Sequence, residues 1–304
     1  MKNFVIRLVV FLVPIIVFFG LMEISLRNIP NDYSFKKKYL DNNSNNIEVL
    51  YLGSSHVYYG VNPEFSNYAS FNAAHISQSL DYDLAILNKY KNCWNSLRYI
   101  ILPVDYFSLY STLKDGKEKW RVKNYALYYG IENKNLRGNF ELLNGRFSSN
   151  FKRIKDKLVE NKTDVTSNKL GWGFTNNSRD AVDLLKSGKM AAERHTKIKN
   201  IETINNNIKT LNEIIQFADT QKVKVIFFTA PAFNSYVNNL NKEQLSNTIS
   251  IIKKISSGNN NINYFNLLGD DSFTNKDFYD ADHLNERGAY KLTLKLDSII
   301  AETL

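Results

Sequence analysis

The sequence predicts an α/β fold in which helices cover both faces of a parallel central sheet. Short, continuously apolar runs such as VKVIFFTAP at 223–231 have the length and composition of strands buried inside a parallel sheet. Between these runs, apolar residues recur every three or four positions, as in 201–218, which is the spacing of a helix. Strands that alternate with helices in this way form parallel sheets.

The predicted elements follow one another along most of the chain. The first half contains strand 47–53, helix 79–91 and strand 98–104. The second half contains helix 201–218, strand 223–231, helix 242–256, strand 261–268 and helix 285–304. The alternation is interrupted around 111–200, a basic and aromatic segment that we expect to be an insertion, serving either as a lid over a site or as extra packing.

The bulk composition narrows the class of protein. The chain has 304 residues, of which 43% are hydrophobic, so it can bury a sizeable core. Its net charge of +9 comes from scattered lysines, and no nucleic-acid-binding motif accompanies it, so we expect no nucleic-acid partner. The single cysteine, Cys93, excludes an internal disulfide framework and a thiolate metal site.

The N-terminus has the composition of a membrane anchor. Residues 8–22 carry no charge, and together with the preceding apolar residues they are long enough, as a helix, to cross a hydrocarbon core of about 30 Å. A cleaved signal peptide is the alternative, although no small-x-small cleavage site follows. We therefore expect a transmembrane anchor at 1–25, a polar, Asn-rich linker at 26–46, and a body at 47–304 that lies outside the cytoplasm.

The first predicted strand ends in the sequence Gly-Ser-Ser-His, residues 53–56. In an open α/β sheet, ligands bind outside the carboxyl ends of the strands, where these residues stand. A serine on a tight strand-to-helix turn exposes its hydroxyl and its own backbone N–H together, which suits a nucleophile, and Gly53 permits such a turn. The alternative is that the two serines only cap the next helix.

A second polar cluster, DADH at 280–283, stands near the other end of the chain. An aspartate three residues before a histidine can accept the imidazole N–H and leave the other ring nitrogen free to act as a base, and Asp280 and His283 have this spacing. Asp282 and His283 could instead be metal ligands, but no further ligands stand at a diagnostic spacing, so we expect no metal and no other cofactor. A purely structural loop is the third reading.

Three segments together resemble the SGNH/GDSL hydrolase family: LGSSH at 52–56, FNAAHISQS at 71–79 and DADHLNERGA at 280–289. The resemblance covers roughly 47–106 and 201–304. It implies a three-layer, flavodoxin-like fold and an activity of the esterase, lipase or carbohydrate acyl-group class. By position, Ser55 matches the nucleophile, His283 the base and Asp280 its acidic partner, while Ser54 stands where the family usually has aspartate.

The resemblance is weaker at the oxyanion hole. Besides the backbone N–H of Ser55, the candidates are the N–H of Ser77, which replaces the usual glycine, and the side chain of Asn72. Asp105 stands where the family presents an asparagine, and an ionised carboxylate 4 Å from an oxyanion is repulsive by on the order of 4 kcal/mol at an effective dielectric of about 20. Either Asp105 points elsewhere, or it is protonated, or the hole uses other donors, or the site is catalytically weak.

Three histidines remain outside this assignment. His56 follows the candidate nucleophile directly, and because adjacent residues on a turn point apart, we do not expect it to be the base. His75 either lines the cleft or packs against the sheet, so His56 and His75 join Ser54 and Asp105 as cleft candidates. His195 is expected at the surface of the insertion, where the neighbouring Arg194 could contact an anionic substrate.

The residues and the resemblance together predict an extracytoplasmic, membrane-anchored serine esterase or O-acyltransferase. The expected substrate is an acylated glycan of the cell envelope or a secreted glycan, with acetyl as the leading acyl group, or a small ester. Water or a sugar hydroxyl would resolve the acyl-enzyme. The alternative is a catalytically degenerate relative that binds a glycan or a partner protein in an envelope assembly, a hypothesis motivated by Asp105 and Ser54.

Overall fold

The computed structural model describes residues 1–131 and 136–303, so residues 132–135 of the expected insertion lie outside the described part. The described residues form two compact units. The first contains 1–37 and 119–165, and the second contains 38–118 and 166–304. The expected insertion at 111–200 is therefore divided between the two units rather than forming one separate segment.

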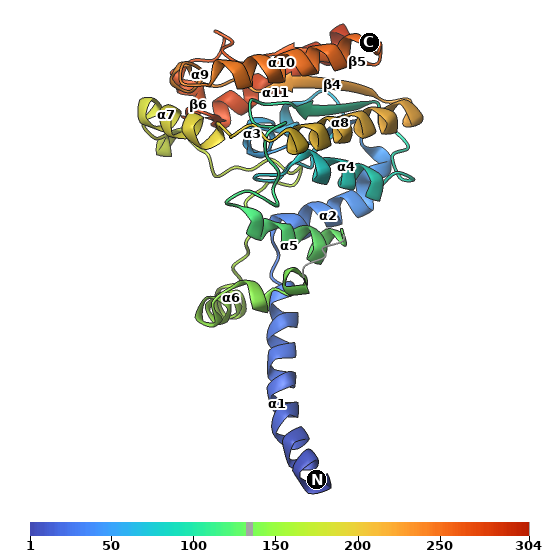
Figure 1. Ribbon diagram of the computed structural model, residues 1–304, viewed down its shortest axis with the longest axis vertical. Coiled ribbons are helices and arrows are strands. Elements are labelled where there is room, and N and C mark those ends of the chain that lie inside the picture. Colours follow the sequence, from blue (N-terminus) through green and yellow to red (C-terminus); the bar gives the residue numbers. More distant parts are fainter. Residues whose placement is uncertain (132–135, 304) are drawn as a thin grey trace. The chain divides into compact units, whose positions relative to one another are not determined.

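A five-stranded parallel sheet forms the centre of the second unit (Figure 1). Its strands are β1 (Val49–Tyr51), β2 (Ser70–Asn72), β3 (Tyr99–Pro103), β4 (Lys224–Thr229) and β5 (Ile262–Asn266). Their order is β2-β1-β3-β4-β5, and every neighbouring pair is parallel. This is the flavodoxin-like doubly wound order, whose direction of winding reverses between β1 and β3. The predicted α/β class with a parallel central sheet is confirmed.

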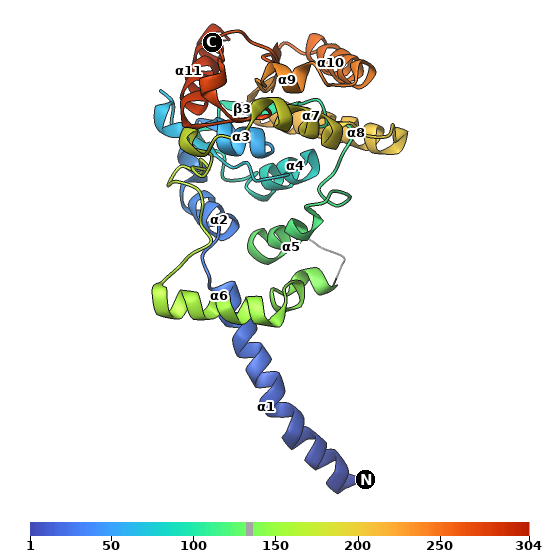
Figure 2. The ribbon, with the colours of Figure 1, turned by 90° about the vertical axis from the view of Figure 1, so that its left-hand side faces the viewer.

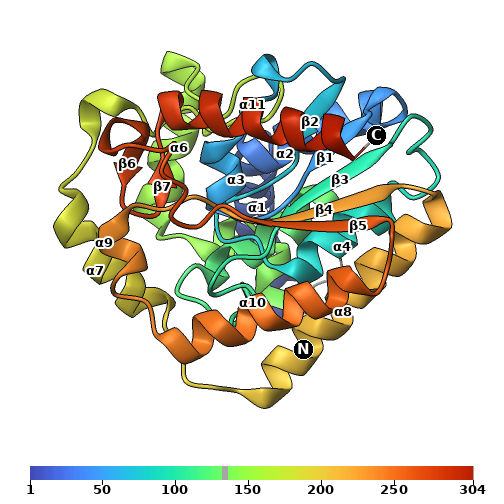
Figure 3. The same ribbon diagram turned by 90° about the horizontal axis from the view of Figure 1, so that it is seen from above.

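Helices cover both faces of this sheet (Figure 3). One layer contains α3 (Ser55–Gly60) and α11 (Glu286–Glu302), and the other contains α4 (Leu80–Lys89), α8 (Ile201–Gln221) and α10 (Lys242–Ser257). Tyr51 and Ile101 share a buried cluster with Leu296 of α11, whereas their strand neighbours Leu50 and Ile100 are fully buried on the opposite side. Burial on both faces explains why these strands are apolar without alternation.

Four smaller elements complete the second unit beside the sheet. They are α7 (Leu184–His195), α9 (Asn234–Val237) and a two-stranded antiparallel hairpin of β6 (Phe278–Asp280) and β7 (His283–Leu284). Helix α7 packs against α9, and the two helices bury Ala191, Ala192 and Tyr236. The part of the expected insertion that forms α7 is thus integrated into the core of the second unit.

The first unit is helical. It contains α1 (Lys2–Arg27), α5 (Val122–Asn124), α6 (Phe147–Glu160) and the start of α2 (Asp32–Asn43). In both units, the short 3-10 and π turns among the described residues are η1 (Ser44–Asn46), η2 (Pro63–Phe65), η3 (Lys119–Arg121), η4 (Tyr125–Tyr129), η5 (Leu136–Asn139), η6 (Leu142–Asn144), η7 (Ser178–Asp180) and η8 (Asn275–Asp277). Among the described residues, α1 is the one helix long and apolar enough to cross a membrane, as an anchor or as a signal sequence.

The segment 26–46, which we expected to be a linker, is largely helical. The end of α1, helix α2 and the turn η1 occupy most of it. The side chain of Asn31 starts α2, because its Oδ1 accepts the backbone N–H groups of Tyr33 and Ser34 at 3.0 and 3.1 Å. Asparagine is a favourable residue at a helix start, so an Asn-rich composition alone does not predict irregular structure.

Candidate active site

A sharp turn at the carboxyl end of β1 presents Ser55. Gly53 adopts φ +116°, a conformation that residues with a side chain rarely adopt. A Cβ built on it would also lie 2.5 Å from the side chain of Pro103, so the backbone conformation and the lack of space both require glycine. The N–H of Gly53 donates to the buried carboxylate of Asp83 at 2.8 Å, which holds the turn. Ser54 caps α3 by accepting the N–H of His56 at 3.4 Å, and Ser55 is the first residue of that helix. Ser54 therefore caps the helix, while the hydroxyl of Ser55 is left to contact other groups of the site.

The hairpin β6–β7 brings Asp280 and His283 together, because the two residues are paired across it. Nδ1 of His283 lies 2.9 and 3.1 Å from the two carboxylate oxygens of Asp280, and Nε2 lies 2.8 Å from Oγ of Ser55. Asp280 Oδ1 also accepts the backbone N–H groups of Asp282 and His283 at 3.1 and 2.8 Å, which fixes the carboxylate. Ser55, His283 and Asp280, separated by 228 and 3 positions, thus form one hydrogen-bonded series.

This series lies where the strand order reverses. Ser55 follows β1 and Asp105 follows β3, and the crevice outside two such strand ends is the usual ligand site of a doubly wound sheet. The side chain of His283 is 15% exposed, so a ligand can approach the Ser55–His283 pair. An imidazole whose Nδ1–H is held by a carboxylate and whose Nε2 meets a hydroxyl is arranged to take a proton from that hydroxyl.

A second carboxylate influences His283. Burial lowers the pKa of the imidazole, but the negative charges of Asp282 and Asp280 outweigh it and the pKa is raised above its usual value. Asp282 Oδ1 lies 3.8 Å from His283 Nδ1. Asp282 is itself buried, and its Oδ2 accepts a hydrogen bond from the guanidinium of Arg194 at 3.1 Å. Desolvation of the Asp282 carboxyl is offset by His283, His56 and His195, and its pKa is lowered.

Asp105 pairs with His56. Its Oδ2 lies 2.8 Å from His56 Nδ1, and its Oδ1 accepts the backbone N–H of Ala230 at 2.9 Å. Both side chains are buried, at 5% and 4% exposure. Burial lowers the pKa of His56, but the charge and hydrogen bond of Asp105, with a further contribution from Asp282, raise it to about 10. Of the four possibilities for Asp105, the geometry matches the first, and the carboxylate charge is neutralised by an adjacent imidazolium.

His195 is mostly buried, with its side chain 15% exposed, whereas we had expected it at the surface. Its Nδ1 lies 2.9 Å from the hydroxyl of Tyr236, and its ring lies 4.4 Å from that of Phe107 and 6.3 Å from that of His56. Burial lowers the pKa of His195 to about 3, assisted by the positive charges of His56, Arg194 and His283, although Asp282 opposes the shift. His195 is therefore a neutral ring beside the charged pair of Asp105 and His56. Arg194 contacts the carboxylate of Asp282.

The remaining candidates, Ser77, Asn72 and His75, differ in backbone conformation, hydrogen bonds and burial. Ser77 adopts φ +59°, the left-handed conformation that favours the glycine usual at this position, and the side chain does not prevent it. Asn72 donates both amide N–H groups to backbone carbonyls, those of Val57 and Val61, each at 2.8 Å. We expected Asn72 as an oxyanion donor, but its amide is hydrogen-bonded to α3 and to Val61, the residue that follows α3. His75 is 1% exposed, so it packs inside the fold.

Three groups of the site could in principle hold a metal ion. The candidate ligand atoms of His56, Asp282 and His283 lie within 4.8 Å of one another. Asp282 and His283 were considered as ligands from the sequence, but His56 was not, because it stands 226 positions before Asp282. Both nitrogens of His283 and Nδ1 of His56 are already hydrogen-bonded, so a metal would have to displace the contact to Ser55 or the contact to Asp280. The hydrogen bonds of His56 and His283 therefore suit proton transfer better than metal binding.

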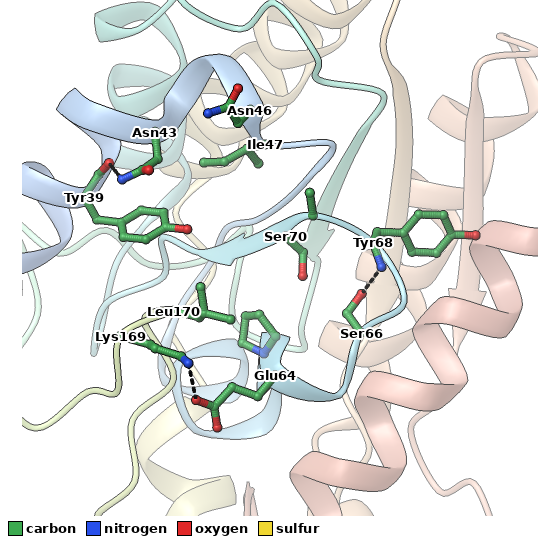
Figure 4. A pocket seen from close by; sticks show the side chains of 12 residues that line it. Tyr39, Asn43, Asn46, Ile47, Glu64, Ser66, Tyr68, Ser70, Lys169 and Leu170 are labelled. Carbon is green, nitrogen blue, oxygen red and sulfur yellow. Dashed lines mark hydrogen bonds and ion pairs between the residues drawn. The ribbon is translucent and has the colours of Figure 1, made fainter.

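A cavity of about 500 Å³ lies elsewhere in the second unit (Figure 4). Residues before β1 and around β2 line it, including Tyr39, Tyr68 and Ser70, and Lys169 and Glu64 lie 4.0 Å apart at its wall. None of Ser55, Asp280 and His283 is among its lining residues. Since the lining residues Ser70 and Ile47 lie at or before the amino ends of their strands, this cavity is separate from the candidate active site.

Comparison with known proteins yields alignments at low identity. No protein-family model matches the chain, and no curated protein shows significant similarity to it. A provisionally assigned platelet activating factor from Streptococcus pneumonia aligns over 92% of this chain and 97% of its own, with 13% identity and a TM-score of 0.44. A provisionally assigned acylhydrolase from Bacteroides fragilis aligns over 88% and 95%, with 10% identity and a TM-score of 0.42. We base the functional proposal on the geometry of the site.

Proposed function

We propose that the protein is a serine ester hydrolase or O-acyltransferase of the SGNH type. The observation that carries the proposal is the contact of 2.8 Å between Ser55 Oγ and His283 Nε2, with Asp280 holding the other ring nitrogen. Such an arrangement generates a nucleophile at neutral pH, which a helix cap or a packing contact does not need.

The reaction would proceed in two acyl transfers. Ser55 Oγ attacks the carbonyl carbon of the ester while His283 Nε2 takes the hydroxyl proton, and Asp280 stabilises the imidazolium that forms. His283 then returns the proton to the leaving alcohol, so that an acyl-Ser55 ester remains. Water or a sugar hydroxyl attacks this ester, with His283 again as base, and the acyl group leaves as a free acid or as a new ester. The acceptor alone distinguishes a hydrolase from a transferase.

The negative oxygen formed during each attack needs hydrogen-bond donors. The backbone N–H of Ser55 is available in the first turn of α3, where N–H groups have no partner within the helix. Ser77, in its left-handed conformation after β2, supplies the second candidate N–H. Asp105 does not oppose this charge as a bare carboxylate would, because His56 neutralises it. The main objection to catalysis, an aspartate at this position, is thereby weakened.

The place of action follows from α1. An uncleaved α1 would anchor the chain in a membrane, and we propose that the catalytic unit lies outside the cytoplasm and acts on acyl groups, foremost acetyl groups, of a cell-envelope or secreted glycan. The length and apolar character of α1, whose apolar stretch is not buried in the protein, support the membrane anchor but do not bear on the side of the membrane. A reporter fused after residue 40 tests the orientation.

The test of the enzymatic proposal is covalent labelling with a fluorophosphonate, which reacts with activated serines. The wild-type protein should label, and Ser55→Ala should not. Ser54→Ala is the matched control, because it removes the neighbouring hydroxyl and a helix cap worth about 1 kcal/mol but leaves Ser55 in place. A folded wild-type protein that does not label would refute catalysis and favour the binding-protein alternative. Release of acetate from acetylated sugars, with and without a sugar acceptor, then separates hydrolase from transferase.

A further inference from the structure

Helix α6 of the first unit has an exposed apolar face. Phe147, Phe151, Ile154 and Leu158 recur at spacings of four, three and four, so they share one side of the helix. Phe147, Phe151 and Leu158 are 52%, 55% and 80% exposed, and the two phenylalanine rings stack with their centroids 6.4 Å apart. A surface helix of a globular protein normally turns such a face toward the core. Here the protein leaves it uncovered.

The same helix is fixed to the end of the apolar helix α1. The ring of Phe147 meets that of Phe19 edge-on, with centroids 6.5 Å apart. The carboxylate of Glu23 accepts the backbone N–H groups of Glu141 and Leu142 at 3.0 and 2.8 Å, just before α6. Arg27 donates to the carbonyl of Asn139 at 2.7 Å. These contacts lie within the first unit, where Figure 2 shows α6 lying crosswise to α1.

The level of this attachment along α1 matches a membrane surface. The uncharged stretch ends at Met22, and Glu23 is the first charged residue after it. Phe19 and Glu23 are four residues apart, which is about 6 Å along a helix axis. Amphipathic helices that lie in the membrane plane bury their apolar face about 5 to 10 Å into the boundary between headgroups and acyl chains. If α1 crosses a bilayer, α6 is held at that depth.

The charges of α6 agree with this placement. The helix carries four basic residues, Lys152, Arg153, Lys155 and Lys157, and two acidic ones, Asp156 and Glu160. Lys155 is exposed and lies about 40° around the helix from Phe151, beside the apolar face, where it can reach lipid phosphates. We infer that α6 is an in-plane membrane helix, which inserts Phe147, Phe151 and Leu158 into the leaflet from which α1 emerges. The inference rests on the proposed anchoring role of α1 and is independent of the proposed catalysis.

The test places a fluorophore at single cysteines of the full chain in phosphatidylcholine–phosphatidylglycerol liposomes. Cys93, which is exposed, is first replaced by serine. NBD probes then go on Phe151→Cys, on Leu158→Cys as a second site of the same face, and on Ser149→Cys as the matched control. Ser149 is also exposed, but two residues correspond to about 200° around a helix, so it faces away from Phe151. Val13→Cys, within the apolar stretch of α1, reports on the anchor.

Lipids with a nitroxide on the acyl chain should quench the probes at Phe151, Leu158 and Val13, whereas aqueous iodide should quench the probe at Ser149. Quenching at Val13 without lipid quenching at Phe151 and Leu158 would overturn the inference and leave the anchor intact. Absence of lipid quenching at Val13 would overturn the anchor and the inference together, while fluorophosphonate labelling of Ser55 would be unaffected. Probes at Phe151 and Leu158 that neither quencher reaches would show that protein covers this face, which also refutes the inference.

Discussion

Replacing Asp105 with asparagine should change how the stability of the second unit depends on pH. Asparagine keeps the shape and can still accept the N–H of Ala230, but it removes the charge 2.8 Å from His56 Nδ1. Without that charge, the largest influence that keeps the proton on His56 is lost, so the pKa of His56 falls, although Asp282 still favours the charged ring. In the wild type, the pKa of His56 is raised from 6.5 to about 10, a difference of 3.5 that corresponds to up to about 5 kcal/mol of stability.

The sign of the effect follows from the direction of the pKa change. Because the pKa of His56 is higher in the folded than in the unfolded protein, its contribution is fully present below pH 6.5 and is lost as the pH rises through about 10. The wild type should therefore exceed Asp105→Asn in free energy of unfolding by several kcal/mol below pH 6.5, and this gap should narrow steadily toward pH 10.

The assay is urea unfolding in detergent, followed by tryptophan fluorescence at a series of pH values. Replacing Trp120 by phenylalanine confines the signal to Trp94 and Trp172, which belong to the second unit. Asp270→Asn is the control, because Asp270 pairs with Lys295 away from the site and its effect should stay constant over this range. A gap between wild type and Asp105→Asn that does not change with pH would show that His56 is not an imidazolium held by Asp105.

Four further outcomes follow from the site. Ser55→Ala and His283→Ala should each abolish turnover of p-nitrophenyl acetate about as completely as the double variant, since triad members act as one unit; additive losses would argue against cooperation. Asp280→Asn should lower kcat by about 10³- to 10⁴-fold in a protein of unchanged Tm, and a loss below tenfold would remove Asp280 from the triad. The charge of Asp282 helps to raise the pKa of His283, whose neutral form is the base. Asp282→Asn should therefore move the acidic limb of the pH profile of kcat/KM to lower pH. An acidic limb that stays in place would contradict this role of Asp282. Gly53→Ala should lower the free energy of unfolding by about 1 to 3 kcal/mol because of the positive φ, and by more because of the contact with Pro103. The control is Gly269→Ala, where φ is also positive but no atom lies within 4 Å of the added Cβ. The drop in Tm should be larger for Gly53→Ala than for Gly269→Ala.

The sequence predicted those parts of the site that depend on local order. Asp280 and His283 stand three positions apart, and a short hairpin is enough to pair them. Ser55 was placed from the strand-to-turn pattern, whereas its pairing with His283, which lies on the separate hairpin β6–β7, was expected from the family resemblance. Gly53 was expected to permit the turn, and the contact with Pro103 adds a second reason that only the neighbouring strand reveals.

The parts that depend on which strands are neighbours could not be predicted. Asp105 was assigned by its position after a strand, but its partner His56 becomes evident only once β1 is known to pair with β3. His195 was expected at the surface because the segment around it has no clear periodicity, whereas α7 packs on α9 and carries the ring toward Tyr236. Composition likewise failed for 26–46, where a single side chain, that of Asn31, is enough to start a helix.

Asp105 and His56 depend on each other and are best considered as one pair. A buried carboxylate without a partner typically costs about 3 to 5 kcal/mol, and a buried imidazole without a carboxylate nearby loses its proton, so each charge depends on the other residue. Together they form a neutral pair, and the ring of His56 lies 5.2 Å from that of His283. Because the two charges cancel, the field at Ser55 is closer to that of a polar, uncharged side chain than to that of a carboxylate. An aspartate after β3 is therefore compatible with acyl transfer in this chain, for a reason that lies in the residue next to Ser55.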